Sequence, residues 1–426
     1  MSKSMQDYQS KVQANSRKNF ILNILDGTFF SFGMGFISRS TILPLFVSQL
    51  TDSKFIISLI MSIYMLGTTI PQLFTANIAE SLKKNIKAIA ITGFLQRVPF
   101  LILAVMTFFI GGEQKVILLV IFFILWSAFS FFMGAVIPFW FGMVSKVTPD
   151  DMRGKLFGYK GFLGNVLKVA GAFLAGIIIK QYLFPLNFTI LFFLTFVSIM
   201  LSYAFVVMVK EPSYPTSNNK LSIKDYFNKL VTIIKKKRNF KMYLISVVFT
   251  NFIGMVNGLY SVAAVERLGL SGDAAGTMVS TFTVLLISFQ SLSSIIWGHF
   301  SDKWGHKFVL ISASILNILG AVIAVMANVP LMFYLVFIFT GTALGGTMVS
   351  FLAIIPDFCK QEEVPSYTAI ANIIKGLVVT VIALIGGLIV DLFNYQIAFA
   401  AAAAMMIIGL YILKFKVVEP RVDQVN

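Results

Sequence analysis

The sequence predicts an all-α polytopic membrane protein in which twelve transmembrane helices form two bundles of six. Of the 426 residues, 58% are hydrophobic and only 12% are charged, whereas soluble domains carry about 25% charged residues. Apolar runs long enough to cross a bilayer, about 20 residues each, recur along the whole chain. Basic residues gather in alternate loops between these runs, as in chains that cross a membrane repeatedly.

Charged or turn-forming residues bound twelve apolar runs. We predict spans near residues 20–49, 55–79, 86–110, 116–144, 157–180, 185–209, 242–265, 274–297, 308–327, 331–356, 367–391 and 395–413. The predicted organisation is therefore an N-terminal tail (1–19), a six-helix bundle (20–210), a linker (211–241), a second six-helix bundle (242–413) and a C-terminal tail (414–426).

The distribution of basic residues predicts the orientation of the spans. Of the 34 Lys and Arg residues, the loops on one side hold only Lys54, Lys115, Lys180 and Arg267, while the tails and the other loops hold most of the rest. Cytoplasmic loops carry the excess of Lys and Arg. We therefore expect a multi-pass protein of the plasma (inner) membrane with both termini in the cytoplasm.

The linker 211–241 begins with Pro, Ser and Asn and then becomes basic. From Ser222 onward, Ile223, Phe227 and Leu230 recur at helical spacing opposite the lysines. This pattern predicts a basic amphipathic helix on the inner leaflet of the bilayer.

Several function classes are excluded by composition. The net charge of +16 follows the membrane topology, which argues against nucleic-acid binding. A single cysteine, Cys359, rules out disulfides within the chain, and the only histidines, His299 and His306, lie in one loop. No phosphate-binding loop, catalytic triad or metal-ligand spacing is present. We predict no enzyme activity and no cofactor.

The two halves contain matching short patterns. Asn165 and Lys168 in the fifth span correspond to Asn372 and Lys375 in the eleventh. Glu211-Pro212 after the sixth span and Glu419-Pro420 after the twelfth follow at nearly the same offset. Two independent matches indicate an internal duplication, which in transporters places the substrate site between the repeats.

The stretch Gly298–Lys307 is predicted to form a short charged turn between two spans. Its pattern G-x-x-x-D-K-x-G-x-K resembles the loop signature of the major facilitator superfamily. The first-half counterpart, Asn77–Lys84, keeps an acid followed by lysines but lacks both glycines, and Asp151-Met152-Arg153-Gly154 resembles another loop of the family.

The resemblance covers nearly the whole chain and implies two similar bundles that rock about a central site. In the family, these loops latch the cytoplasmic side. Carried over by position, the resemblance implies gating roles for the residues Glu80, Arg153, Gly298, Asp302, Lys303, Gly305 and Lys307.

Four cations lie inside predicted spans and away from the span ends: Arg39, Arg97, Lys168 and Lys375. An ionised side chain at a helix centre costs about 2.5–3.5 kcal/mol on insertion scales. Only two acids, Asp26 and Glu266, are available at depth. The excess of positive charge predicts an anionic substrate.

Asn165 with Lys168, and Asn372 with Lys375, each share a helix face because they are three residues apart. Together with Arg39 they form our predicted substrate-binding set, since ammonium and guanidinium groups bind carboxylate or phosphate.

The remaining membrane charges have two interpretations each. Arg97 is predicted to form a structural ion pair with Asp26. Asp26 is alternatively a proton-coupling acid, because burial favours the neutral form of a carboxyl group. Glu266 is either a solvated partner of the adjacent Arg267 or a second coupling acid.

The sequence thus predicts a monomeric secondary transporter that works by alternating access in the lipid bilayer. We expect proton coupling and a small, anionic substrate, with no nucleic-acid partner. Two alternatives remain open: a proton-driven exporter of hydrophobic compounds, and a non-transporting membrane sensor or assembly protein on the same scaffold.

Overall fold

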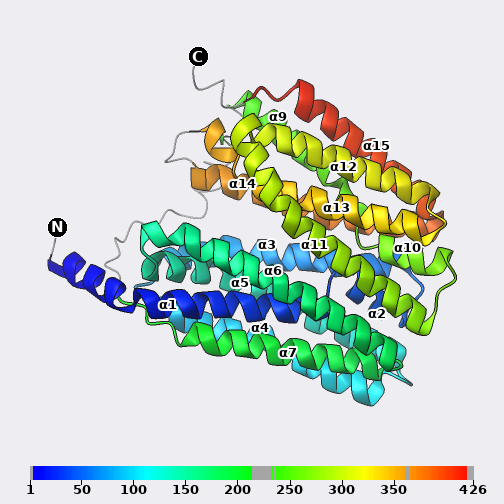
Figure 1. The fold of residues 1–426 in the computed structure, drawn as a ribbon, viewed down its shortest axis with the longest axis horizontal. Helices are drawn as coiled ribbons and strands as arrows, with labels where there is room; N and C mark the ends of the chain where they lie inside the picture. The colour runs from blue at the N-terminus through cyan, green and yellow to red at the C-terminus, as the bar shows by residue number, and fades with distance from the viewer. Residues whose placement is uncertain (1–2, 214–231, 234–236, 360–363, 420–426) are drawn as a thin grey trace. The chain divides into compact units, whose positions relative to one another are not determined.

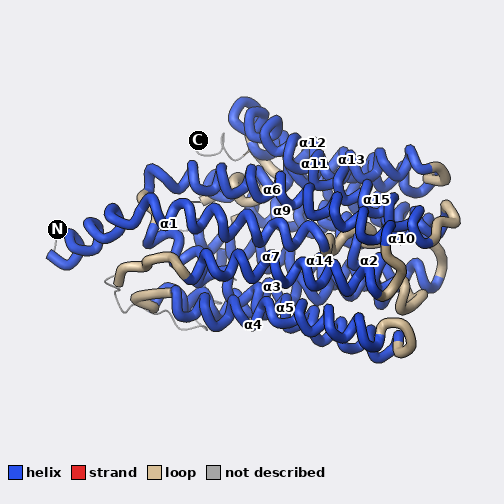
Figure 2. The backbone as a smooth tube through the Cα atoms, turned by 60° about the horizontal axis from the view of Figure 1, so that its bottom comes forward, coloured by secondary structure: helices blue, strands red, loops and turns tan. Residues whose placement is uncertain are grey.

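The computed structural model describes residues 3–213, 232–233, 237–359 and 364–419, and within them every regular element is a helix (Figure 1). A helix satisfies its backbone hydrogen bonds within one segment, which is what a bilayer interior demands. Short loops join successive helices (Figure 2). The predicted all-α fold is confirmed. The predicted amphipathic helix of the linker lies mostly in 214–231 and 234–236, outside the described residues.

The first half of the chain supplies α1 to α7. Their bounds are α1 Lys3–Phe36, α2 Ile42–Ser48, α3 Lys54–Ser81, α4 Ile86–Ile110, α5 Lys115–Val147, α6 Asp150–Gln181 and α7 Leu186–Val207. The second half supplies α9 to α15 and two 3₁₀ segments. Their bounds are α9 Arg238–Thr250, η1 Asn251–Met255, α10 Tyr260–Arg267, α11 Gly272–Trp304, α12 His306–Met326, α13 Pro330–Ser350, η2 Ile355–Phe358, α14 Val364–Leu392 and α15 Tyr395–Phe415.

By packing, the chain divides into two compact units. Unit 1 contains residues 1–38 and 63–220, and unit 2 contains residues 39–62 and 221–426. The segment 39–62, with α2 and the first turns of α3, therefore packs with the second half of the sequence. Helix α3 itself runs unbroken through the boundary at residue 62.

Within the part of the chain that the structure describes, eleven helical segments are long and apolar enough to span a membrane. The first predicted span is not among them. Its helix α1 carries Asn19, Asn23 and Asp26, three polar side chains that are all buried in the structure. Helix α1 still packs as a member of unit 1, against α6 and α7.

Two predicted spans are interrupted rather than continuous. The span 20–49 breaks at residues 37–41, between α1 and α2. The span 242–265 breaks between α9 and α10, where η1 and a turn occupy 251–259. These are the first spans of the two halves. Irregular backbone at membrane depth is tolerated only where protein buries it or where it borders a water-filled cavity.

Two further boundaries differ from prediction. The predicted turn over Gly298–Lys307 is helical almost throughout, because α11 continues to Trp304 and α12 begins at His306. The reversal takes place at Gly305 alone, whose φ of +86° is accessible to glycine. The predicted span 331–356 ends earlier as a helix, at Ser350.

Close helix contacts in unit 1 depend on small residues. A Cβ atom at Gly35 of α1 would overlap the backbone of α6 near Lys168, and one at Gly171 of α6 would lie 2.6 Å from the carbonyl oxygen of Phe32. Membrane helices associate through such small residues because lipid offers no hydrophobic drive between them. In unit 2, α13 packs against α11 and α12, and α15 packs against α9 and α12.

Candidate functional site

A buried charged cluster lies inside unit 1, centred on Asp26 of α1, whose residue is 6% exposed. One carboxylate oxygen, Oδ1, accepts a hydrogen bond from Ser202 Oγ of α7 at 2.7 Å. The other, Oδ2, accepts one from Trp140 Nε1 of α5 at 3.0 Å. Lys160 Nζ of α6 lies 3.8 Å from the same oxygen and 3.5 Å from the centre of the Trp140 ring. Three helices thus converge on one carboxylate of a fourth.

Arg97 of α4 adjoins this cluster, but the predicted direct ion pair with Asp26 is not found there. The guanidinium donates to the carbonyl oxygens of Ile199 and Gly93, each at 2.6 Å, and to Ser202 Oγ at 3.1 Å. Ser202 therefore stands between Arg97 and Asp26. Among the described side chains, the cation that pairs with Asp26 is Lys160.

Lys160 is a member of this cluster that sequence reasoning missed. The predicted fifth span begins at residue 157, which places Lys160 in its first turn, near the membrane surface, rather than at membrane depth. In the structure α6 begins at Asp150, and Lys160 lies well inside the helix. The neighbouring Asp26-Gly27 pair contains the signal: a Cβ atom at Gly27 would overlap the Lys160 side chain, so only glycine leaves room for the lysine beside Asp26.

The two helix interruptions meet inside unit 2. Asn257 Nδ2, from the break 251–259, donates to Ser40 Oγ in the break 37–41 at 3.3 Å. Ser261 Oγ donates to the Ser40 carbonyl at 3.4 Å. Asn257 is 6% exposed, and its Oδ1 has no hydrogen-bond partner among the described residues. A buried amide oxygen without a partner is costly, so it is a candidate contact for a ligand or a water.

Two of the predicted substrate-binding cations belong to unit 2. Arg39 lies on the 37–41 break, next to Ser40, and its charge repels that of Lys375 on α14. Lys375 Nζ also lies 4.2 Å from the centre of the Phe351 ring. Asn372 is on the same helix and is exposed. Arg39, Asn372 and Lys375 of the predicted set therefore all belong to unit 2.

Asn165 and Lys168 lie on α6 in unit 1, and both are half-buried. They share a helix face as the spacing predicts. Their role in substrate binding, like that of the set as a whole, remains a prediction.

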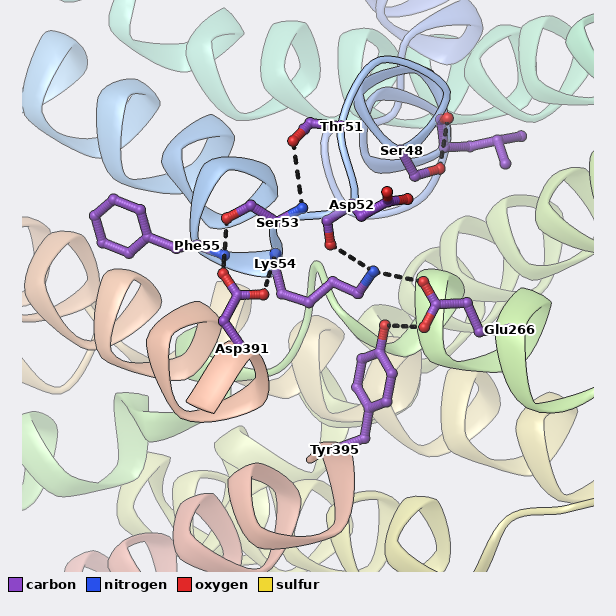
Figure 3. Close-up of polar contacts among 10 residues, drawn as sticks. Ser48, Thr51, Asp52, Ser53, Lys54, Phe55, Glu266, Asp391 and Tyr395 are labelled. Atoms are coloured by element: carbon purple, nitrogen blue, oxygen red, sulfur yellow. Dashed lines mark hydrogen bonds and ion pairs between the residues drawn. The ribbon is translucent and has the colours of Figure 1, made fainter. Parts of the chain in front are cut away.

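Glu266 ends α10 at the outer side of unit 2, by which we mean the helix ends away from the basic loops. Its carboxylate binds Lys54 Nζ of α3 at 2.5 Å and accepts a hydrogen bond from the Tyr395 hydroxyl of α15 at 2.8 Å (Figure 3). The predicted partner, Arg267, instead donates to the carbonyl oxygens of Ala324 and Ala327. The Glu266 side chain is 44% exposed, so water still reaches it.

The predicted gating residues of the second half gather around Gly305. Asp302 and Lys303 are exposed on the last turn of α11, and Lys307 Nζ donates to the carbonyl oxygen of Lys414 at 3.3 Å. Gly298 lies within α11, where no other atom would lie within 4 Å of a Cβ. The side chains of Glu80 and Arg153 lie outside the described part of the structure. The gating roles therefore remain predictions.

The duplicated Glu-Pro pattern has a structural counterpart in each half. Glu211 Oε2 accepts hydrogen bonds from the backbone N–H groups of Asn85 and Ile86, at 2.7 and 2.8 Å, where α4 begins. Glu419 Oε1 would lie 3.2 Å from a Cβ atom at Gly305, directly before α12. Each acid therefore lies at the N-terminus of the third spanning helix of its half, where the helix dipole favours negative charge.

Several aromatic side chains of α5 serve packing rather than a lined cavity. Trp126 and Phe129 are fully buried and stack on one another, and Trp126 also stacks on Tyr64 of α3. These rings fill the core of unit 1.

Comparisons with known proteins agree with this architecture. The solved structure of a D-xylose–proton symporter matches with a TM-score of 0.73 at 13% identity, covering 95% of this chain and 98% of that one. A variant of the nucleoside transporter NupG matches with a TM-score of 0.72 at 12% identity, covering 93% and 98%. A variant of the peptide transporter POT in complex with sulfate matches with a TM-score of 0.68 at 13% identity, covering 93% and 94%. At these identities the similarity shows the fold. No curated protein sequence matches the chain.

The sequence profile described as the Major Facilitator Superfamily matches residues 27–265 and 242–426, which together span nearly the whole chain. The structure agrees with this match. It contains two six-helix bundles, an interrupted first span in each half and a turn at Gly305. The chain belongs to the major facilitator superfamily.

Proposed function

We propose that this protein is a proton-coupled secondary transporter of a small anionic molecule, which binds at the helix interruptions of unit 2. The observation that carries the proposal is the meeting of the two broken spans at Ser40 and Asn257, where the buried Asn257 Oδ1 has no hydrogen-bond partner among the described residues. The charge of Arg39, next to Ser40, also repels that of Lys375 on α14. Discontinuous helices form substrate sites in many transporters, because their free backbone groups and unpaired polar atoms can meet a ligand.

The electrostatics favour an anion over a cation or a neutral solute. The charges of Arg39 and Lys375 repel one another, and such repulsion is stronger where the dielectric constant is low. A carboxylate or phosphate between the Arg39 guanidinium and the Lys375 ammonium group would remove that repulsion and form charge-assisted hydrogen bonds. The amide oxygen of Asn257 would accept a hydrogen bond from a hydroxyl or amine elsewhere on the substrate.

We infer that the proton is carried at Asp26. Its buried carboxylate faces Lys160. Protonation would leave the lysine charge without a compensating anion and so weaken the attraction between α1 and α6. Glu266 is the second candidate. Because it is more exposed, its protonation would change the energy of its ion pair with Lys54 less.

The first test is a thermal-shift screen of the purified protein with anionic, neutral and cationic metabolites. A ligand present at 100 times its Kd stabilises the folded state by about 2.7 kcal/mol. We expect only anions to stabilise the wild-type protein. Arg39→Gln and Lys375→Gln should each abolish that shift, whereas Lys180→Gln, at an exposed lysine of α6, should retain it.

The coupling step is tested with an anion identified in this way. Added to the protein in weakly buffered solution with a pH-sensitive dye, it should cause proton uptake by the wild-type protein and none by Asp26→Asn. Proton uptake that persists in Asp26→Asn would contradict the assignment of Asp26.

The two alternatives predict different results from the same screen. Stabilisation by hydrophobic cations, undiminished in Arg39→Gln and Lys375→Gln, would support an exporter of hydrophobic compounds. A protein that binds a ligand but moves none across proteoliposome membranes would support a sensor.

A further inference from the structure

We infer that Asp391 is the central residue of an outer latch, a set of contacts that fastens the start of α3 to α14 and must break once in each transport cycle. The inference rests on alternating access and is independent of the charge of the substrate. The outer latch is defined by Ser53, Lys54, Ser58, Asp391 and Glu266, all of which lie in unit 2.

Asp391, near the end of α14, binds the start of α3 through three hydrogen bonds (Figure 3). Its carboxylate accepts from the backbone N–H of Lys54 at 2.6 Å, from the backbone N–H of Phe55 at 2.9 Å and from Ser53 Oγ at 2.7 Å. The first N–H groups of a helix have no partner within it and carry partial positive charge. One carboxylate thus satisfies two of these donors and the adjoining hydroxyl.

The contact continues along both helices. Antiparallel to one another, α3 and α14 meet again at Ser58, whose side chain a Cβ atom at Gly387 would overlap, and at Ser62, whose Oγ donates to the carbonyl oxygen of Thr380 at 2.8 Å. Small residues and serine hydroxyls allow two membrane helices to approach closely and to separate without exposing a large apolar face.

Lys54 joins this contact to two more helices. Its ammonium group binds Glu266 of α10 and the carbonyl oxygen of Asp52, and Glu266 in turn accepts from Tyr395 of α15. The charged groups that face the outer latch are therefore the acids Asp391 and Glu266 and the cation Lys54, with Arg267 close to the Tyr395 ring. Two acids and one lysine thus add charged contacts to the hydrogen bonds of Ser40 and Ser62 that also tie the segment 39–62 to the rest of unit 2.

A permanent structural contact and a latch can be told apart by the effect of their loss on the opposite side of the membrane. The segment 39–62 belongs by sequence to the first half, and in alternating access the two halves must separate at the outer side in one state and at the inner side in the other. Loss of the outer latch should therefore make the latch residues more accessible to water. It should also make residues at the inner side, where the basic loops lie, less accessible to water.

The experiment measures labelling by a water-soluble maleimide in nanodiscs, which leave both sides of the membrane accessible. Cys359→Ser removes the native thiol. The labelling rate of Ser58→Cys then measures opening of the outer side, because Ser58 is only 7% exposed and packs against Gly387. Asn372→Cys, an exposed position nearer the other end of α14, reports the inner side.

We expect Asp391→Asn to raise the labelling rate of Ser58→Cys about tenfold or more, because three hydrogen bonds to a charged acceptor are weakened. The same change should lower the labelling rate of Asn372→Cys. Glu266→Gln should act in the same direction with a smaller effect. Asp273→Asn, which removes an exposed acid at the outer start of α11, should change neither rate.

Two results would overturn the inference. One is an unchanged Ser58→Cys rate in Asp391→Asn protein that elutes as a single folded species. The other is a rise in both labelling rates, which indicates general loosening rather than a switch between sides. Should Asp391→Asn fail to fold, the same two outcomes are read from Glu266→Gln.

Discussion

Asp26 in unit 1 and Glu266 in unit 2 are the two acids that we propose from the sequence for proton coupling, and the structure gives them opposite surroundings. Asp26 is 6% exposed and faces Lys160 at 3.8 Å, with hydrogen bonds from Ser202 and Trp140. The Glu266 side chain is 44% exposed and touches Lys54 directly. The shorter ion pair is the more solvated one.

This difference shows that distance alone does not rank the two ion pairs. In water, a close pair is worth little, because solvent already stabilises both charges and the side chains lose entropy. In a buried setting, a looser pair matters more, since removing one partner leaves the other charge without compensation. We therefore expect Asp26 to govern the stability of its unit and Glu266 to govern the outer latch.

The largest expected effect follows the loss of the buried carboxylate. Asp26→Asn should lower the free energy of unfolding by about 2 kcal/mol, because Lys160, whose side chain is 22% exposed, then lacks its anion. Thermal and chemical unfolding in detergent measure it. The double variant Asp26→Asn with Lys160→Met should recover much of the loss, since a buried pair replaced by neutral groups is close to neutral in energy. A double variant less stable than the single one would contradict this account.

A second buried acid extends the comparison. Glu211 has a fully buried side chain that accepts two backbone hydrogen bonds at the start of α4 and faces Lys146 at 3.9 Å. Glu211→Gln keeps the shape and removes the charge, and we expect a loss of about 2 kcal/mol in unfolding free energy. Glu113→Gln, at an exposed acid, is the matched control. Equal effects of the two changes would argue against burial as the deciding factor.

The exposed acid should have a smaller effect on stability. Glu266→Gln is expected to change the free energy of unfolding by less than about 1 kcal/mol, although it should raise maleimide labelling at Ser58→Cys. The unfolding transition and the labelling rate are measured on the same preparation. A destabilisation as large as that of Asp26→Asn would remove the distinction between the two sites.

The smallest effect is one of ionic strength. Raising the salt concentration from about 0.1 to 1 M shortens the Debye length from about 10 to 3 Å, which weakens exposed pairs and leaves buried ones almost untouched. The stability difference between wild type and Glu266→Gln should therefore shrink, and that for Asp26→Asn should stay constant. Unfolding midpoints at the two salt concentrations decide the matter.

The positions of the helices were predictable because the bilayer fixes how long an apolar run must be. The predicted span 86–110 coincides with α4, Ile86–Ile110. The interruptions at 37–41 and 251–259 were not predictable from hydropathy, since apolar residues continue on both sides of each break. Ser38-Arg39-Ser40-Thr41 in one and Asn257-Gly258 in the other are the local signals of a break.

The sequence predicted most of the charged residues at membrane depth, but it did not predict which of them interact with one another. The sequence shows that Asp26 and Arg97 both lie at membrane depth, but their pairing depends on helix rotation, and Ser202 of α7 lies between them. Lys160 escaped notice because the start of α6 was placed too late. Asp391 escaped because its partners are backbone N–H groups, which no sequence pattern displays.

The polarity of α1 has a consequence for how the protein is made. Asn19 exchanges hydrogen bonds with the backbone of Lys210, 191 residues later in the chain, and Asp26 binds Ser202, 176 residues later. During synthesis, the first span therefore leaves the ribosome long before the helix that satisfies its polar groups exists. Because α1 is also absent from the strongly apolar segments found in the described residues, we expect its stable insertion into the bilayer to await the emergence of α7. The first helix made should then be among the last of its bundle to settle.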